Sequence, residues 1–244
     1  MTEAAPGTRD KSLALLSRGE VEVLGLLPYS SNYVFLARLR EEGQEALAVY
    51  KPRRGERPLW DFPRGTLAAR EVAAYLVSEA AGWSIVPPTV LRTDAPMGPG
   101  SMQLFIDHDP DRHYFTLAEE RLQEFVVFAT FDVVVNNADR KAGHIIEDAA
   151  GRLWGVDHGV SFHTEEKLRT VIWHLAEQPL DTASVEGLLR LQSALKDRGS
   201  LDGELTALLS SRESAAALRR VERFLRRRRL PSPGSDYHLP WPLI

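Results

Sequence analysis

Short apolar runs separated by turn-forming residues mark the first half of the chain. Residues 21–27, 33–39 and 46–50 are rich in side chains that favour strands, and the segment 28–32 separates the first two runs. Runs of this length, bounded by proline, serine and asparagine, are typical of β-strands. We therefore expect three consecutive strands in this part of the chain.

One helix interrupts this β-rich half. Apolar residues recur at helical spacing after Thr66, which we expect to cap the helix, and Gly82 follows Ala81 as a stop signal. Two further strands are predicted beyond the helix, at residues 89–92 and 102–106.

The second half shows mainly helical patterns. Thr116 and Glu119 form the signature of a capping box in front of a long apolar run, which predicts a helix over residues 117–135. Two short strands are expected next, near residues 144–147 and 153–156.

Helices are also predicted over most of residues 165–229, where Ser210 and Glu213 form a second capping box. The last segment, 230–244, is rich in proline, and we expect an extended tail docked through Trp241.

A β-rich half followed by a helical half predicts an α+β fold with two lobes that face a cleft. We place the first lobe at residues 1–106, the helical lobe at 107–229 and the tail at 230–244.

The composition is that of an ordinary globular protein, with 43% apolar and 26% charged residues. A net charge of −4 gives no reason to expect nucleic acid as a partner. The absence of cysteine excludes disulfides and thiolate metal sites. Residues 1–10 lack the apolar core of a signal peptide, and the apolar run 125–135 is too short to span a bilayer. We expect a cytoplasmic protein.

Polar side chains gather where the long apolar run ends. Six of them fall within nine residues, from Asn136 to His144, and such a cluster is unfavourable beside a buried helix unless its members are paired or functional. Asp157 follows 18 residues after Asp139, at the end of an apolar strand. Each acid alone is explained by an ordinary turn. Together, on loops beside one hairpin, they are able to converge on Mg²⁺.

The first half offers residues for a phosphate site. Lys51 ends a predicted strand, and Glu71 lies in the predicted helix about one turn after Thr66. A solvated surface explains each one alone, whereas a pair would hold the lysine for phosphate binding, as in kinases. The segment 28–32 is a candidate loop over the phosphates or a simple hairpin turn.

The order of these parts resembles the protein-kinase-like superfamily. Within it, the sequence is similar to the phosphatidylinositol 3-/4-kinase family, above all to type II 4-kinases and their bacterial relatives. Four motifs carry the resemblance: VYKP at 49–52, EVAAYLVSEAAGWSIVPPT at 71–89, Asp132-x4-Asn137-x-Asp139-Arg140, and GVDHGVSF at 155–162. The resemblance covers residues 25–162.

This resemblance implies a two-lobed kinase fold that binds ATP with Mg²⁺ or Mn²⁺. Asp139, with Arg140 beside it, would be the catalytic residue that orients or deprotonates the acceptor hydroxyl, and Asp157 would hold the metal. The residues that would bind the nucleotide are Ser30, Ser31, Asn32, Lys51, Glu71, Gln103, Leu104, Phe105 and Ile106.

One position departs from the family pattern. Five residues after the catalytic acid, where the family has an asparagine that binds a second metal, this chain has His144. Imidazole suits Mn²⁺ better than Mg²⁺. We therefore expect His144 to bind metal and to lose it on protonation near pH ~6.5.

Three functions are compatible with the sequence. The first is a kinase that phosphorylates a hydroxyl of a lipid, a protein or a small molecule. The alternative is a nucleotide-binding pseudokinase with a regulatory or scaffold role, which His144 favours. The third is a binding protein that uses the basic helix 219–229 and in which the aspartates are structural. Basic clusters bind phosphoinositide head groups or nucleic acid, which would give peripheral membrane contact, but we favour a solvated helix face as the explanation of those arginines.

Overall fold

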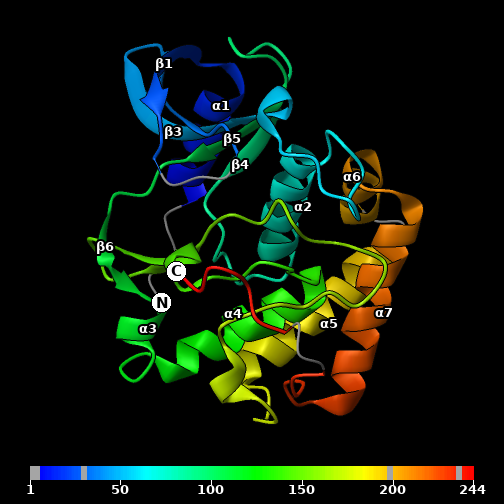
Figure 1. The fold of residues 1–244 in the computed structure, drawn as a ribbon. Coiled ribbons are helices and arrows are strands. Elements are labelled where there is room, and N and C mark those ends of the chain that lie inside the picture. The colour runs from blue at the N-terminus through cyan, green and yellow to red at the C-terminus, as the bar shows by residue number, and fades with distance from the viewer. Residues whose placement is uncertain (1–5, 29–31, 197–199, 235–237) are drawn as a thin grey trace.

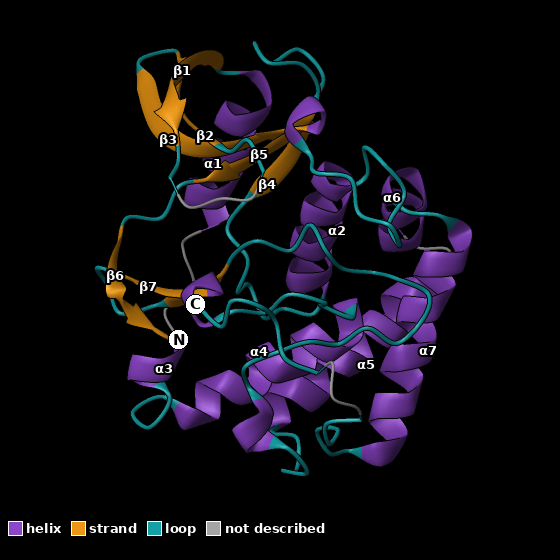
Figure 2. Cartoon of the chain, viewed as in Figure 1, coloured by secondary structure: helices purple, strands orange, loops and turns teal. Residues whose placement is uncertain are grey.

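The computed structural model describes residues 6–28, 32–196, 200–234 and 238–244. A five-stranded sheet with one helix forms one lobe, and a group of helices forms the other, with helix α2 (Leu67–Ala80) between them (Figure 1). Figure 2 shows that the larger sheet lies in the N-terminal lobe and that helices dominate the rest. The predicted two-lobed α+β architecture is confirmed.

The remaining elements of the N-terminal part are α1 (Pro6–Arg18), β1 (Glu20–Leu26), β2 (Phe35–Glu41), β3 (Gln44–Pro52), β4 (Thr89–Arg92) and β5 (Gly100–Leu104). Those of the C-terminal part are β6 (His108–His113), α3 (Tyr114–Leu117), α4 (Leu122–Val135), β7 (Ile145–Asp148), β8 (Leu153–Gly155), α5 (Thr182–Lys196), α6 (Ser200–Leu208) and α7 (Ser211–Arg227). Short 3₁₀ turns occupy Arg53–Gly55, Ala142–His144 and Trp173–Leu175.

The larger sheet has the antiparallel order β1-β2-β3-β5-β4. Alternate residues of β3, Ala48 and Tyr50, are buried in the small core that the sheet forms with Leu15 and Leu16 of α1. Because side chains alternate along a strand, the neighbouring Lys51 points to the opposite face of the sheet, toward the helical lobe.

Four element predictions were wrong. Strand β6, which pairs with β7, was not expected. Helix α1 was not expected, although its Leu15 and Leu16 cover the sheet. The predicted helix over residues 117–135 is two helices, α3 and α4, because residues 118–121 form a turn between them. Residues 165–181 contain only one short 3₁₀ turn, and their backbone bonds instead to the segment after α4.

Two capping predictions were also wrong. Helix α2 begins after Thr66, as expected, but the Thr66 hydroxyl donates to the Pro63 carbonyl at 2.7 Å, and Glu56 accepts the Ala68 N–H at 3.0 Å. Thr116 lies inside α3, where its hydroxyl accepts the His113 N–H at 3.1 Å. The capping box of Ser210 and Glu213 is present at the start of α7.

Helix α2 belongs to both lobes. Its residues Ala73, Ala74 and Val77 are part of the large core that α4, α5, α6 and α7 build. In the chain the same helix lies between β3 and β4 of the five-stranded sheet. The proposed lobe boundary near residue 106 stays a prediction.

The C-terminal tail packs on the helical lobe, but not through Trp241, which is 88% exposed. Instead the His238 carbonyl accepts the Trp173 indole N–H at 2.8 Å, and the Leu243 carbonyl accepts the Ala142 N–H at 2.8 Å. The C-terminus therefore lies beside the segment that precedes β7 (Figure 1).

Candidate active site

Lys51 stands at the centre of a cluster of charged side chains between the lobes. Its Nζ forms an ion pair with Glu71 of α2 and a second one, at 2.9 Å, with Oδ1 of Asp157. Glu71 also accepts the backbone N–H of His158 at 2.9 Å. The strand, the helix and the loop after β8 therefore meet at this lysine, and the expected Lys51–Glu71 pair is present.

The backbone at Asp157 is unusual. Its φ of +60° lies in the left-handed region, which Asp and Asn tolerate better than other residues with a side chain. This conformation follows the end of β8 at Gly155. It turns the chain so that the carboxylate reaches Lys51 and the next residue reaches Glu71.

The charges in this cluster support one another. Burial alone would raise the pKa of Asp157, but Lys51 outweighs it and holds the pKa well below its usual range. Burial would lower the pKa of Lys51, and the carboxylates of Asp157 and Glu71 raise it instead. Burial raises the pKa of Glu71, although Lys51 opposes the shift. Lys51 and Asp157 are both charged at neutral pH.

Asp139 lies in the loop after α4, where its backbone N–H donates to Asn137 Oδ1 at 3.0 Å. Lys141 Nζ lies 3.4 Å from its Oδ2. Burial raises the pKa of Asp139 to about 6, with Lys141 opposing the shift and the negative charge of Asp157 adding to it. A carboxyl group with such a pKa is able to accept a proton near neutral pH.

His144 connects the two acids. Its Nδ1 lies 2.9 Å from the Asp139 carbonyl oxygen, and its Nε2 lies 3.4 Å from Asp157 Oδ2. The Lys141 N–H also points at Nδ1, at 3.4 Å, but the Asp139 carbonyl is closer and only accepts. Nδ1 is therefore assigned the proton, and Nε2 presents its lone pair to Asp157. Burial lowers the pKa of His144 to about 4, so protonation near pH 6.5, expected from the ordinary pKa of histidine, does not occur here.

Arg140 has a different place from the one expected beside a catalytic acid. It is fully buried, and its guanidinium donates to Asp132 at 2.8 Å, to the Val156 carbonyl at 3.2 Å and to His158 Nε2 at 2.7 Å. It cannot touch a substrate from this position. It ties the loop of Asp139 to the loop of Asp157 and acts as a positioning residue.

Two partners in this network stand in the quoted motifs, but sequence reasoning gave neither of them a role. Asp132 is a fully buried acid in a helix of apolar residues, and His158 is a fully buried imidazole beside Asp157. The signal for Asp132 was available, because a charge on an otherwise apolar helix requires a partner.

The side chains fit a divalent metal with few protein ligands. Asp157 offers a carboxylate and His144 the lone pair of Nε2, and the two atoms face each other at 3.4 Å. Among the described residues, no group of three or more histidine or acidic side chains is placed to hold a metal. Mg²⁺ and related ions in nucleotide sites bind one or two protein groups and take further oxygens from phosphate and water.

The other residues predicted to contact the nucleotide are less well placed for binding it than Lys51 and Asp157 are. Ser30 and Ser31 lie outside the described residues, and the Asn32 side chain accepts the Arg57 N–H at 2.8 Å. Gln103 and Leu104 belong to β5, where the Gln103 amide donates to Thr89 at 2.8 Å and the Leu104 N–H to Pro88.

The rest of the expected adenine linker is short. The Phe105 N–H donates to the Leu47 carbonyl at 2.9 Å, so neither Leu104 nor Phe105 has a free backbone donor for adenine. Residues 105–107 form the connection between β5 and β6, and Ile106 lies in its middle. Of the predicted linker only Ile106 remains for contact with adenine, and its carbonyl oxygen lies 2.9 Å from His108 Nδ1.

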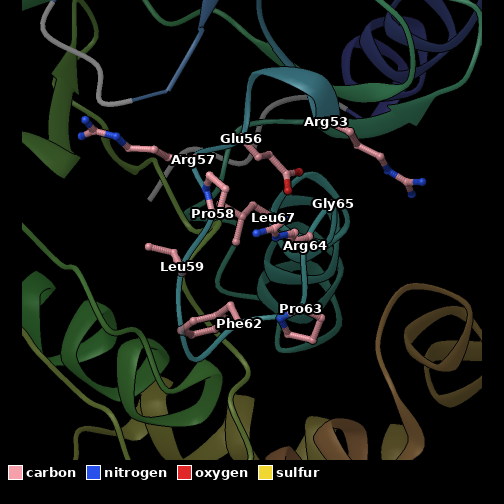
Figure 3. Close-up of a pocket in the computed structure, with 10 residues that line it drawn as sticks. All are labelled: Arg53, Glu56, Arg57, Pro58, Leu59, Phe62, Pro63, Arg64, Gly65 and Leu67. Atoms are coloured by element: carbon pink, nitrogen blue, oxygen red, sulfur yellow. The ribbon is translucent and has the colours of Figure 1, made fainter.

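A pocket of about 190 Å³ lies next to the charged cluster. It is formed by the loop between β3 and α2, and Figure 3 shows Arg53 and Arg57 extending away from it to opposite sides. Glu56 and Leu67 line this pocket and also the small pocket that contains Lys51 and Asp157. The loop of residues 53–66 therefore borders the candidate active site.

Comparison with known proteins identifies relatives of the chain. It is 38% identical over 269 aligned positions to protein Rv2133c of Mycobacterium tuberculosis, and the match spans 96% of both chains. The chain belongs to the Rv2133c family. No family model matches it. It is also 29% identical over 187 positions to phosphatidylinositol 4-kinase gamma 4 of rice, a match that spans 60% of this chain and 33% of the rice protein.

The fold of this Rv2133c family member is that of protein kinases. The Golgi casein kinase with Mn/ADP bound matches 92% of the chain with a TM-score of 0.59 and 14% identity, over 76% of its own length. Hydra Fam20 with sugar matches 93% of the chain with a TM-score of 0.58 and 17% identity, over 89% of its length. The predicted protein-kinase-like fold is confirmed, whereas membership of the phosphatidylinositol 3-/4-kinase family stays a prediction.

Proposed function

We propose that this protein is a kinase that transfers the γ-phosphoryl group of ATP to a hydroxyl group, with Mg²⁺ or Mn²⁺ as cofactor. The observation that carries the proposal is the contact of Lys51 with both Glu71 and Asp157 in a protein-kinase-like fold. A lysine held by carboxylates between two lobes is placed to bind phosphates.

Each residue then has a definite role. Lys51 binds phosphate oxygens, and Glu71 holds the lysine in position. Asp157 and His144 would hold the metal, which neutralises negative charge on the phosphates when bound. Asp139 orients the acceptor hydroxyl and takes its proton, and Arg140 keeps the two acidic loops together.

The acceptor class is a separate question. The rice relative is named for a phosphatidylinositol lipid and the Golgi neighbour for a protein, casein. Both acceptor types supply a hydroxyl, so the same reaction serves either. Incubation of the purified protein with γ-labelled ATP and extracts of its own cells, followed by separation of labelled lipid, protein and small molecules, identifies the acceptor.

A pseudokinase is the second candidate, and His144 is the observation that favours it. The imidazole stands at the position where the resembling family has asparagine, and it uses Nδ1 for the Asp139 carbonyl. Saturable ATP binding without turnover under either metal would support this candidate over the first.

The test of nucleotide and metal binding uses Asp157→Asn. Asparagine keeps the size of the side chain and tolerates a φ of +60°, so the fold is expected to persist. In the wild type, Mn²⁺ with ATP should raise the Tm, because a ligand that binds only the native state stabilises it. Asp157→Asn should lose this increase, and the exposed control Asp10→Asn should retain it. An unchanged increase in Asp157→Asn would remove Asp157 from the site.

The described residues include no helix that is both long enough and apolar enough to cross a membrane. The cytoplasmic location, where ATP is abundant, stays a prediction. Peripheral contact through the basic face of α7 also stays a prediction.

A further inference from the structure

A pocket of about 320 Å³ with charged walls lies on the helical lobe, between α7 and the segment that follows Asp157. Its charged lining consists of Arg219, Arg220, Arg223, Arg226, Glu166 and Glu222. The four arginines follow one another at intervals of one, three and three residues, so Arg219, Arg223 and Arg226 share one face of the helix.

Arg220 is the unusual member of this group, since only 5% of it is exposed. Its Nε donates to the Val134 carbonyl at 2.8 Å and its Nη1 to the His163 carbonyl at 3.2 Å. Its Nη2 is buried and has no hydrogen-bond partner among the described residues. Burial lowers the pKa of Arg220 to about 10, so the side chain still carries its charge at neutral pH.

The acids of the pocket form their ion pairs with other cations, although the charge of Glu166 also acts on Arg220 and opposes the lowering of its pKa. Glu166 forms an ion pair with Arg223, with distances of 2.8 and 2.9 Å, and Glu222 pairs with Lys196 at 2.8 Å. No carboxylate within the described ranges forms an ion pair with Arg219, Arg220 or Arg226. A buried guanidinium with an unpaired N–H and no ion-pair partner is costly, so an anion bound beside it would stabilise it.

We propose that this pocket is a phosphate-binding site, distinct from the candidate ATP site. Several arginines around one concave surface match the several oxygens and the double negative charge of a phosphate group. A soluble phosphoester and a lipid headgroup with a terminal phosphate present the same chemistry. A merely solvated helix face does not explain Arg220, because that side chain is shielded from water.

The pocket is connected to the candidate active site through one carbonyl group. The His163 carbonyl accepts a hydrogen bond from Arg220 and another, at 3.0 Å, from the side chain of Asn136, which ends α4 three residues before Asp139. Phosphate in the pocket should hold Arg220 in place and with it the segment 163–167. Amide hydrogen exchange in this segment should therefore slow when phosphate binds.

Binding is measured by calorimetric titration of the full chain with pyrophosphate. The double variant Arg219→Gln, Arg226→Gln removes two cations that lack an ion-pair partner, and its affinity should fall at least about tenfold, the equivalent of one charge-assisted hydrogen bond. The control Arg212→Gln changes an exposed arginine of α7 outside the pocket, and its affinity should stay within about twofold of the wild type.

Pyrophosphate also has access to Lys51, so Lys51→Met is titrated in parallel. The proposal is overturned if pyrophosphate binding is lost in Lys51→Met and kept in the double variant. It is also overturned if Arg212→Gln weakens pyrophosphate binding as much as the double variant does, or if the wild type shows no saturable binding. Retention in Lys51→Met with loss in the double variant supports it.

A vesicle experiment separates the two sources of phosphate. Vesicles with phosphatidic acid, which has a terminal phosphate, are compared with vesicles of neutral phosphatidylcholine. If the wild type binds the acidic vesicles and pyrophosphate, and the double variant loses both, the site is assigned to a lipid headgroup. Pyrophosphate binding alone assigns it to a soluble phosphoester. Vesicle binding without saturable pyrophosphate binding would overturn the site in favour of a general basic face.

Discussion

Lys51, which we propose binds phosphate, forms an ion pair of 2.9 Å with Asp157, which we propose binds the metal. A metal that binds Asp157 competes with the lysine for the same carboxylate, and the arriving phosphates offer the lysine new partners. Nucleotide and metal are therefore expected to bind together and to stabilise each other at this site.

The pKa of Asp139 predicts how activity depends on pH. Burial raises it to about 6, and the residue must be ionised to accept the acceptor's proton. The ionised fraction falls as pH decreases through this value, so kcat should fall between pH 7 and 5 rather than below pH 4, where an ordinary aspartate titrates. A pH–rate profile with a γ-phosphate transfer assay measures this, and a flat profile down to pH 5 would contradict it.

Asp139→Asn provides the matched control for that profile. The amide is nearly isosteric but cannot accept the proton, so turnover should fall by two or more orders of magnitude, about the contribution of a general base. Stabilisation by metal and ATP should remain, which separates a loss of chemistry from a loss of binding.

His144→Asn tests the departure from the resembling family. An amide oxygen suits Mg²⁺ better than an imidazole nitrogen does, so the variant should raise Mg²⁺-dependent turnover and reduce any advantage of Mn²⁺. The ratio of turnover with the two metals is the measurement. If His144 only binds the Asp139 carbonyl, at 2.9 Å in this structure, that ratio stays unchanged.

At the scale of elements, helices α2 and α5 are joined by a close approach at a glycine. A Cβ at Gly187 of α5 would lie 2.2 Å from the indole nitrogen of Trp83, which is three residues beyond the end of α2 and 3% exposed. The indole N–H also donates to Ala183 of the same helix at 3.1 Å. The glycine therefore allows α5 to pack directly on the tryptophan.

Gly187→Ala should lower the free energy of unfolding by about 2 kcal/mol, because the added methyl group forces Trp83 out of its position. Gly203→Ala is the control, since Gly203 of α6 has no neighbour within 4 Å of an added Cβ and the change should stabilise the helix by up to about 1 kcal/mol. Urea denaturation of both variants measures the two effects. Equal changes in both would show that the contact with Trp83 has no effect.

At the scale of the whole molecule, Arg70 connects parts that are far apart in the chain. Its guanidinium bonds to the Ser161 carbonyl, 91 residues later, and to Glu213 of α7, 143 residues later, both at 2.5 Å. Arg70 is 1% exposed, so the ion pair is shielded from solvent. It holds α2 against the segment after Asp157 and against the last long helix.

Arg70→Met should lower the free energy of unfolding by about 3 kcal/mol, because it leaves Glu213 buried without its cation. Glu213 keeps its bonds to Ser210, so the helix cap persists and the loss falls on the contact between distant segments. Urea denaturation measures the change. The exposed variant Arg64→Gln should stay within about 0.5 kcal/mol, and an equal loss there would contradict the argument.

The local sequence was sufficient to predict most strands and helix α2. The alternation around Ala48 and Tyr50 predicts β3, and Gly82 ends α2 in the left-handed conformation, with a φ of +73°. These signals act between near neighbours, so they are visible without the fold. Asp139 and Asp157 are also visible in the local sequence, because both acids follow apolar elements. Each alone fits an ordinary turn, and their catalytic and metal-binding roles stay predictions.

The tertiary structure alone decided the environment of these residues. The sequence places Arg140 next to Asp139, but only the fold shows that Arg140 is buried against Asp132 and cannot reach a substrate. The ordinary pKa of histidine predicts titration near pH ~6.5, whereas burial lowers that of His144 to about 4. Burial and charge partners come from segments far apart in the chain, so local sequence determined which elements and acids are present, and only their packing determined their ionisation and contacts.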